Sequence, residues 1–238
     1  MAVFPAERPV TPTTIGTVAV FEQAESDDSG RLGLDPSSVE GGIYALLNSV
    51  VVPRAIAWVS TTSADGVDNL APHSFFTISS VDPPVVQFTS VGTKDSLRNA
   101  TATGEFVVSV CTEELVERVN VTAVPFPGDV SEFDRAGLTR EPSARVTPPR
   151  VGESPVSLEC RVVGTRSFGG TSTVVFGEVV WVAVRAEVVV DDRVAIDRLR
   201  PVSRLGGAAY APVREVFAMP RLTLEEWDAR SGGPDGSS

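Results

Sequence analysis

Residues 85–96 read VVQFTSVGTKDS, an apolar β-branched run that leads through Gly92 into a cluster of polar side chains. The run predicts a strand over 85–91, and the following residues predict a helix over 94–103, with Thr93 as its N-cap and Gly104 as its stop. A helix N-terminus offers unpaired N–H groups and the positive end of its dipole, to which Lys94 and Ser96 add donors. The segment is therefore either a phosphate cradle or a simply capped helix beside a surface lysine.

Strand-like segments surround this one on both sides. An apolar run over 55–62 ends at the turn signal Asp65-Gly66, and a second run begins after Asn69, which predicts a β-hairpin. Further strands are expected over 105–112, 157–163 and 173–190, the last bent or bulged at Gly177. Only short helices are expected between them, over 113–120 and near 131–134. This order excludes a regular βαβ alternation and predicts a mainly β, antiparallel barrel.

The composition restricts the classes of function. The chain of 238 residues has 31 acidic against 20 basic residues, which disfavours binding to nucleic acids or to anionic membranes. Cys111 and Cys160 lie in strand-like sequence and fit buried thiols of a reducing compartment, and we find no export signal, so a cytoplasmic protein acting on small molecules is expected. We expect an N-terminal extension over 1–39, a single domain over 40–222 and a C-terminal tail over 223–238.

A second candidate segment runs from Asn69 to Phe76 and reads NLAPHSFF. Its amide, imidazole, hydroxyl and aromatic groups suit the wall of a pocket for a flat heterocycle, although a strand entering the core would look the same. His73 is the only histidine of the chain, so a metal site is not expected. A ring contact or a proton-donating role for His73 and a purely structural role both stay open.

Two arginines stand near aromatic residues in otherwise apolar sequence. Arg54 precedes Trp58, and Arg204 is followed by Tyr210 across the Gly206-Gly207 turn. Either arginine can bind an anion or flank an aromatic ligand, and either can equally form a salt bridge at an interface.

Taken in order, these segments resemble the flavin reductase-like FMN-binding split-barrel family, in its flavoredoxin-type branch. Ala55 departs from the family pattern, in which proline commonly follows the arginine. The matching stretches are Val52 to Thr61, Asn69 to Phe76, Asp82-Pro83-Pro84, Thr93 to Ser96, Gly104 to Val108, Ser131-Glu132-Phe133, Glu159-Cys160, Gly177-Glu178-Val179 and Arg204 to Gly207 with Tyr210.

The resemblance implies a six-stranded antiparallel split barrel with short inserted helices, usually a homodimer, with the FMN phosphate at Thr93 to Ser96. No side-chain nucleophile is required, and His73 is the one candidate for a catalytic role. The residues that the resemblance and the local chemistry assign to the cofactor are Arg54, Trp58, Ser60, Asn69, Leu70, Ala71, Pro72, His73, Ser74, Ser90, Thr93, Lys94, Asp95, Ser96, Arg204 and Tyr210.

Three functions are compatible with the resemblance. The first is an NAD(P)H:flavin reductase that supplies reduced flavin to a partner monooxygenase. The second is an enzyme that keeps FMN tightly bound and oxidises or oxygenates a small organic substrate, and the third is a non-enzymatic flavin electron carrier. NADH or NADPH as the electron donor follows from the resemblance alone, because the chain lacks a Gly-x-Gly-x-x-Gly fingerprint.

Overall fold

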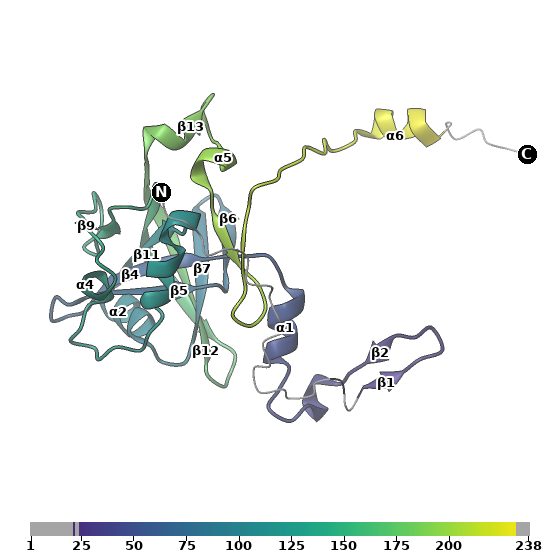
Figure 1. The fold of residues 1–238 in the computed structure, drawn as a ribbon, viewed down its shortest axis with the longest axis horizontal. Coiled ribbons are helices and arrows are strands. Elements are labelled where there is room, and N and C mark those ends of the chain that lie inside the picture. The colour runs from purple at the N-terminus through teal and green to yellow at the C-terminus, as the bar shows by residue number, and fades with distance from the viewer. Residues whose placement is uncertain (1–20, 22–23, 232–238) are drawn as a thin grey trace, which may run out of the picture.

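Seven antiparallel strands form the large sheet of the computed structural model, which describes residue 21 and residues 24–231 (Figure 1). Their order is β5-β4-β8-β11-β12-β7-β6. The strands are β4 (Ala57–Thr62), β5 (Asp68–His73), β6 (Phe76–Val81), β7 (Pro84–Val91), β8 (Glu105–Val110), β11 (Val156–Ser167) and β12 (Ser172–Val184).

The two edge strands of this sheet, β5 and β6, are consecutive in the chain and are separated only by Ser74 and Phe75. The N–H of Thr89 on β7 donates to the carbonyl of Phe75 over 2.9 Å, so the chain passes directly from one edge of the sheet to the other. The sheet thereby closes on itself, which removes exposed edges. The antiparallel barrel is confirmed, and the expected count of six strands is reached only if β5 and β6 are taken as one bent strand.

A second, three-stranded sheet brings together residues that lie 150 positions apart in the sequence. Its order is β16-β15-β3, and Arg204 on β15 is paired with Arg54 on one side and Tyr210 on the other. The strands are β3 (Arg54–Ala55), β15 (Val202–Arg204) and β16 (Tyr210–Pro212).

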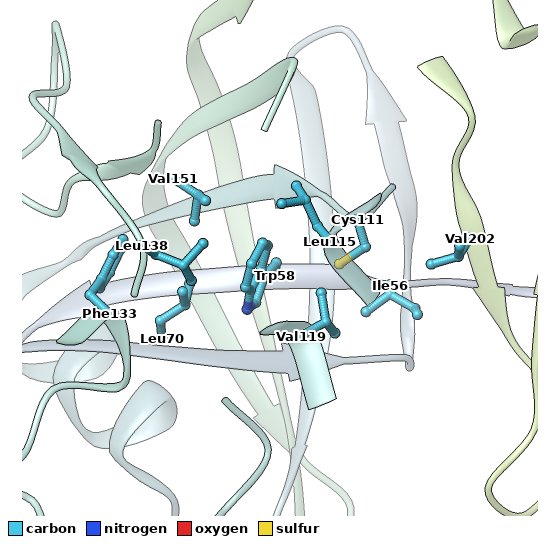
Figure 2. Close-up of a cluster of buried hydrophobic side chains, with 10 residues drawn as sticks. All are labelled: Ile56, Trp58, Leu70, Cys111, Leu115, Val119, Phe133, Leu138, Val151 and Val202. Carbon is cyan, nitrogen blue, oxygen red and sulfur yellow. The ribbon is translucent and has the colours of Figure 1, made fainter. Parts of the chain in front are cut away.

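The predicted hairpin is confirmed, with Ala57 on β4 opposite His73 on β5. Strand β4 is buried on both faces. Val59 belongs to a cluster with Phe88 and Phe106 in the barrel interior. Trp58 belongs to a second cluster outside the barrel, beneath the excursion that follows β8. Figure 2 shows this second cluster, formed by Ile56, Trp58, Leu70, Cys111, Leu115, Val119, Phe133, Leu138, Val151 and Val202.

The helices are short, as expected, but their limits differ from the prediction. Helix α2 spans Asp95–Thr103, and its N-cap is Lys94 rather than Thr93, without any side-chain capping bond. The predicted stop is correct, because Gly104 adopts a left-handed conformation with φ of 76°. The predicted helix over 113–120 is a 3-10 turn, η2 (Glu113–Leu115), that continues into α3 (Val116–Val121). The predicted turn near 131–134 is α4 (Glu132–Arg135).

The long strand expected over 173–190 is shorter in the structure, because β12 ends at Val184 and a 3-10 turn, η3 (Ala186–Val188), follows. The pairing of β11 with β12 is irregular at Glu159/Cys160 and at Val162/Gly164. The second irregularity lies opposite the expected position, because Val162 pairs with Gly177 and Gly164 pairs with Phe176. Gly177 has another role. A Cβ atom placed there would lie 2.3 Å from Cζ of Phe106, whose ring fills the barrel.

Small peripheral elements complete the described chain. The end of the chain, expected as a tail from residue 223, contains helix α6, whereas residues 232–238 lie outside the described residues. Within the described residues, none of the helices is long and apolar enough to cross a membrane. The peripheral elements are β1 (Glu25–Ser26), β2 (Leu32–Gly33), η1 (Pro36–Ser38), α1 (Tyr44–Val50), β9 (Arg140–Glu141), β10 (Arg150–Val151), β13 (Val189–Val190), β14 (Arg193–Val194), α5 (Ile196–Leu199) and α6 (Leu224–Ser231).

We predict that Gly177→Ala lowers the free energy of unfolding by about 1–3 kcal/mol, because the added methyl group overpacks the barrel against Phe106. Urea denaturation followed by far-UV circular dichroism measures the change. Gly164→Ala is the matched control, since a Cβ atom at this other β-strand glycine meets nothing within 4 Å. Equal stabilities of the two variants would contradict the assigned role of Gly177.

Candidate functional site

Two adjoining cavities lie where the small sheet meets the start of α2. The larger has a volume of about 590 Å³ and is bounded by α1, β3, β15, β16 and the crossing after β5. The smaller, of about 240 Å³, lies between β5, the first turn of α2 and residues 122–126. Both cavities are lined by Pro72, Lys94 and Ala123, so Lys94 stands between them.

The larger cavity carries positive charge without compensating carboxylates. Its lining contains Arg54, Lys94 and Arg204 but no aspartate or glutamate. None of these three side chains takes part in an ion pair within the described part of the chain. In a chain with a net charge of −11, this is a local reversal of sign and favours an anionic ligand.

Arg54 is buried and holds the wall of the larger cavity together. Its Nη1 donates to the carbonyls of Asn48 over 2.6 Å and Val51 over 2.9 Å, and its Nη2 donates to the carbonyl of Leu205 over 2.9 Å. Burial, and to a smaller extent the neighbouring charge of Arg204, lower the pKa of Arg54 below its usual range. Because these hydrogen bonds occupy most of the guanidinium, Arg54 contributes its charge and the shape of the wall more than free donors.

The guanidinium of Arg204 lies over an aromatic ring. Its guanidinium carbon lies 4.4 Å from the ring centroid of Tyr210, and its Nη2 donates to the carbonyl of Gly207 over 2.7 Å. The remaining N–H groups of Arg204 stay available at the cavity. The predicted pairing of Arg204 with Tyr210 across the glycine turn is thus present in the structure.

A buried hydrogen-bond network forms one side of the smaller cavity. Nδ2 of Asn69 donates to Oε2 of Glu132 over 3.0 Å, and Oγ of Ser96 donates to Oδ1 of Asn69 over 3.1 Å. The N–H of Leu70 donates to the same Oε2 of Glu132 over 2.9 Å. Asn69 therefore ties β5 to the start of α2 and to α4, which fixes the outline of the cavity.

Our sequence-based prediction did not include Glu132, nor did it include Tyr44 and Asn48, which line the larger cavity. Glu132 lines the smaller cavity, and burial raises the pKa of its carboxyl above the usual range despite the hydrogen bonds from Leu70 and Asn69. Its segment Ser131-Glu132-Phe133 was among the family-like stretches, and that was the signal that pointed to it. A glutamate at the start of a short turn otherwise resembles ordinary solvated surface.

His73 is buried beside the smaller cavity. Its Nδ1 lies 3.3 Å from the carbonyl oxygen of Thr89, and its ring lies 4.8 Å from that of Phe88. Burial lowers the pKa of His73 to about 4, and nearby Lys94 acts in the same direction. The imidazole is therefore neutral at pH 7, which favours a structural or ring-contact role over proton donation.

The predicted cofactor residues divide into two groups. Trp58, Ser60, Leu70 and Ser90 are fully buried away from both cavities, and Trp58 instead donates its indole N–H to Thr122. Thr93 is exposed but lines neither cavity. The residues that the structure brings together at the cavities are Arg54, Asn69, Ala71, Pro72, His73, Ser74, Lys94, Asp95, Ser96, Arg204 and Tyr210.

We predict that the imidazole of His73 titrates near pH 4 in the folded protein, because the charged form loses its hydration on burial. Proton NMR of the histidine ring measures this without ambiguity, since the chain has one histidine. The urea-unfolded chain is the control and should titrate near pH 6.5. Because the unfolded state then binds the proton more readily, the stabilisation linked to His73 falls as the pH drops from about 6.5 towards 4. A folded-state midpoint at or above 6.5 would refute the burial argument.

Comparison with known proteins shows the family to which the chain belongs. Residues 49–197 match the family model described as a flavin reductase-like domain. An uncharacterised protein of Halalkalibacterium halodurans is 40% identical over 194 residues, which cover 77% of this chain and 92% of that protein.

Two solved structures are similar in fold and sequence. The crystal structure of nitrilotriacetate monooxygenase component B from Bacillus cereus is 33% identical, with a TM-score of 0.76, over 79% of this chain and 98% of that one. The 2-nitrobenzoate 2-nitroreductase NbaA of Pseudomonas fluorescens is 31% identical, with a TM-score of 0.71, over 76% of this chain and 91% of that one. The chain therefore belongs to the flavin reductase-like domain family, as shown by the match over residues 49–197, by these relatives and by the closed antiparallel barrel.

Proposed function

We propose that this protein is an FMN-dependent oxidoreductase of the NAD(P)H:flavin reductase type, with the flavin bound across the two cavities. The observation that carries the proposal is the set of Arg54, Lys94 and Arg204 around one cavity without a carboxylate. Lys94, Ser96 and the first turn of α2 hold the phosphate, and Ser74, Arg204 and Tyr210 contact the rest of the cofactor. Family membership supports flavin as the ligand.

The residues present fit such a cofactor. Cavities that hold small molecules span roughly 300–1,000 Å³, and the larger cavity alone has about 590 Å³. Two acidic residues line the smaller cavity. Asp95 forms an ion pair with Arg98, and Glu132 accepts hydrogen bonds from Asn69 and Leu70, so both carboxylates already have partners. An anionic group bound beside Lys94 therefore does not face a carboxylate that lacks a partner.

The bound flavin supplies the hydride chemistry, as flavin cofactors do in general. The side chains of this protein bind the cofactor and orient it. Arg54 keeps the cavity wall in place through its three carbonyl contacts, and neutral His73 adds no charge beside the barrel. No nucleophile is needed, and both cysteine thiols are buried, with their pKa raised by desolvation.

The relatives suggest two physiological settings. Similarity to component B of a monooxygenase supports a role in which this protein delivers reduced flavin to a partner monooxygenase. The family resemblance also leads us to propose that the protein is a homodimer. The nitroreductase supports a second candidate, in which tightly bound FMN acts on a small aromatic substrate. Retention of one FMN per chain through gel filtration, combined with slow oxidation of nicotinamide nucleotides, would favour the second candidate.

We predict that Lys94→Ala weakens FMN binding by about 1–3 kcal/mol, because the variant loses a charge-assisted bond to the phosphate. Quenching of flavin fluorescence during titration gives the dissociation constant. Arg166→Ala is the matched control, since it removes the same charge from an exposed position that lines neither cavity. If both variants bind FMN like the wild type, the phosphate lies elsewhere.

The reductase activity itself has a direct test. On rapid mixing of the FMN-loaded protein with NADH or NADPH, we expect the flavin absorbance near 450 nm to bleach faster than that of free FMN, because binding brings donor and acceptor together. Stopped-flow absorbance records the rate. Bleaching no faster than in the protein-free mixture would rule out the nicotinamide-dependent reaction and leave flavin binding to be judged separately.

A further inference from the structure

The last described part of the chain is an arm that leaves the barrel. After β16 the chain is held by the N–H of Val213, which donates to the carbonyl of Pro201, and by Arg214, whose Nη2 lies 2.9 Å from a carboxylate oxygen of Glu113. Residues 214–230 are all exposed. Figure 1 shows the arm running outward from the body and ending in α6.

The arm carries large apolar side chains that nothing in the described chain covers. Phe217 is 86% exposed, Met219 82%, Leu224 76% and Trp227 57%. Helix α6 is nevertheless well defined at its start, because Oγ1 of Thr223 and the carboxylate of Glu226 form a reciprocal capping box. A helix of eight residues is marginal in water by itself, so a capped helix with an uncovered apolar face implies a surface on which it packs.

Helix α1 presents a matching apolar surface. Tyr44 and Leu47 have the i, i+3 spacing of one helical face and are 58% and 48% exposed. Val51, the residue directly after the helix, is 59% exposed. The same helix borders the larger cavity through Tyr44 and Asn48. A helix packed on this face therefore lies at the rim of the cavity.

We propose that the arm of one copy of this chain crosses to a second copy and packs α6 against α1 there, in a reciprocal exchange. In its own chain the base of the arm is tied to Glu113, and Figure 1 shows α6 far from α1. The nine residues 215–223 span up to ~30 Å when extended, which is enough to bridge two neighbouring molecules.

Charge and area both favour a second copy as the occupant. Helix α6 bears Glu225, Glu226 and Asp228 against the single Arg230, whereas the cavity beside α1 is lined by three cations. Two arms and two receiving faces together would bury on the order of 2,000 Å² of surface, which is the size of a stable interface.

Crosslinking between two chains tests the exchange. One chain carries Val50→Cys on α1, and a second chain with a different affinity tag carries Asp228→Cys on α6; both positions are exposed, and the native Cys111 and Cys160 are buried. The two chains are co-expressed and treated with a short bis-maleimide. Since each chain has one reactive thiol, a product carrying both tags can only join two chains, and we expect it to be the main product.

The control pair combines Val50→Cys with Phe168→Cys, an exposed position on the β11–β12 hairpin, and should give little product. A yield for the α1–α6 pair no greater than the control yield would overturn the proposal, even if the protein were dimeric through another surface.

As a second measurement, replacing both Leu224 and Trp227 by serine should raise the dimer dissociation constant at least tenfold in sedimentation equilibrium. An unchanged constant would also overturn it. Neither measurement requires flavin, so failure of the proposed function would leave this test intact.

Discussion

The passage of the chain through Ser74 and Phe75 from one edge of the sheet to the other is the constraint on which the rest of the structure depends. It closes the barrel through the hydrogen bond from Thr89 to Phe75. It also follows directly on β5, the strand of the barrel wall that borders the cavities. Pro72 on β5 lines both cavities, and Asn69 and His73 line the smaller one. The same hydrogen-bonded frame thus sets the fold and the position of the candidate site.

Charge gives this site its chemical character. The protein is acidic as a whole, yet Arg54, Lys94 and Arg204 meet at one cavity without an ion-pair partner. The two carboxylates that line the smaller cavity have other partners, Asp95 in Arg98 and Glu132 in Asn69 and Leu70. The phosphate of a bound cofactor would neutralise these three cations, which have no carboxylate partner among the described residues. The charge of the cavity and the family membership therefore both support a flavin nucleotide as the ligand.

Local sequence signals predicted the elements whose shape depends on neighbouring residues, such as the hairpin at Asp65-Gly66 and the helix stop at Gly104. Local signals did not predict which side chains are buried by residues far away in the sequence. Trp58 was expected at the cofactor, but the excursion after β8 covers that face of β4 and buries the ring. Glu132 was missed because its burial arises only when Asn69, far away in sequence, packs against it. The site as a set was predicted mainly through the family resemblance.

The comparison of FMN with riboflavin as ligands of the wild-type protein tests the central claim most directly, because the two differ only in the phosphate. Titration of the flavin-free protein, followed by flavin fluorescence, gives both dissociation constants. If the cation-lined cavity and the start of α2 bind a phosphate, FMN should bind at least tenfold more tightly than riboflavin, and added salt should reduce the difference. Equal affinities for the two flavins, or no binding of either, would contradict the account.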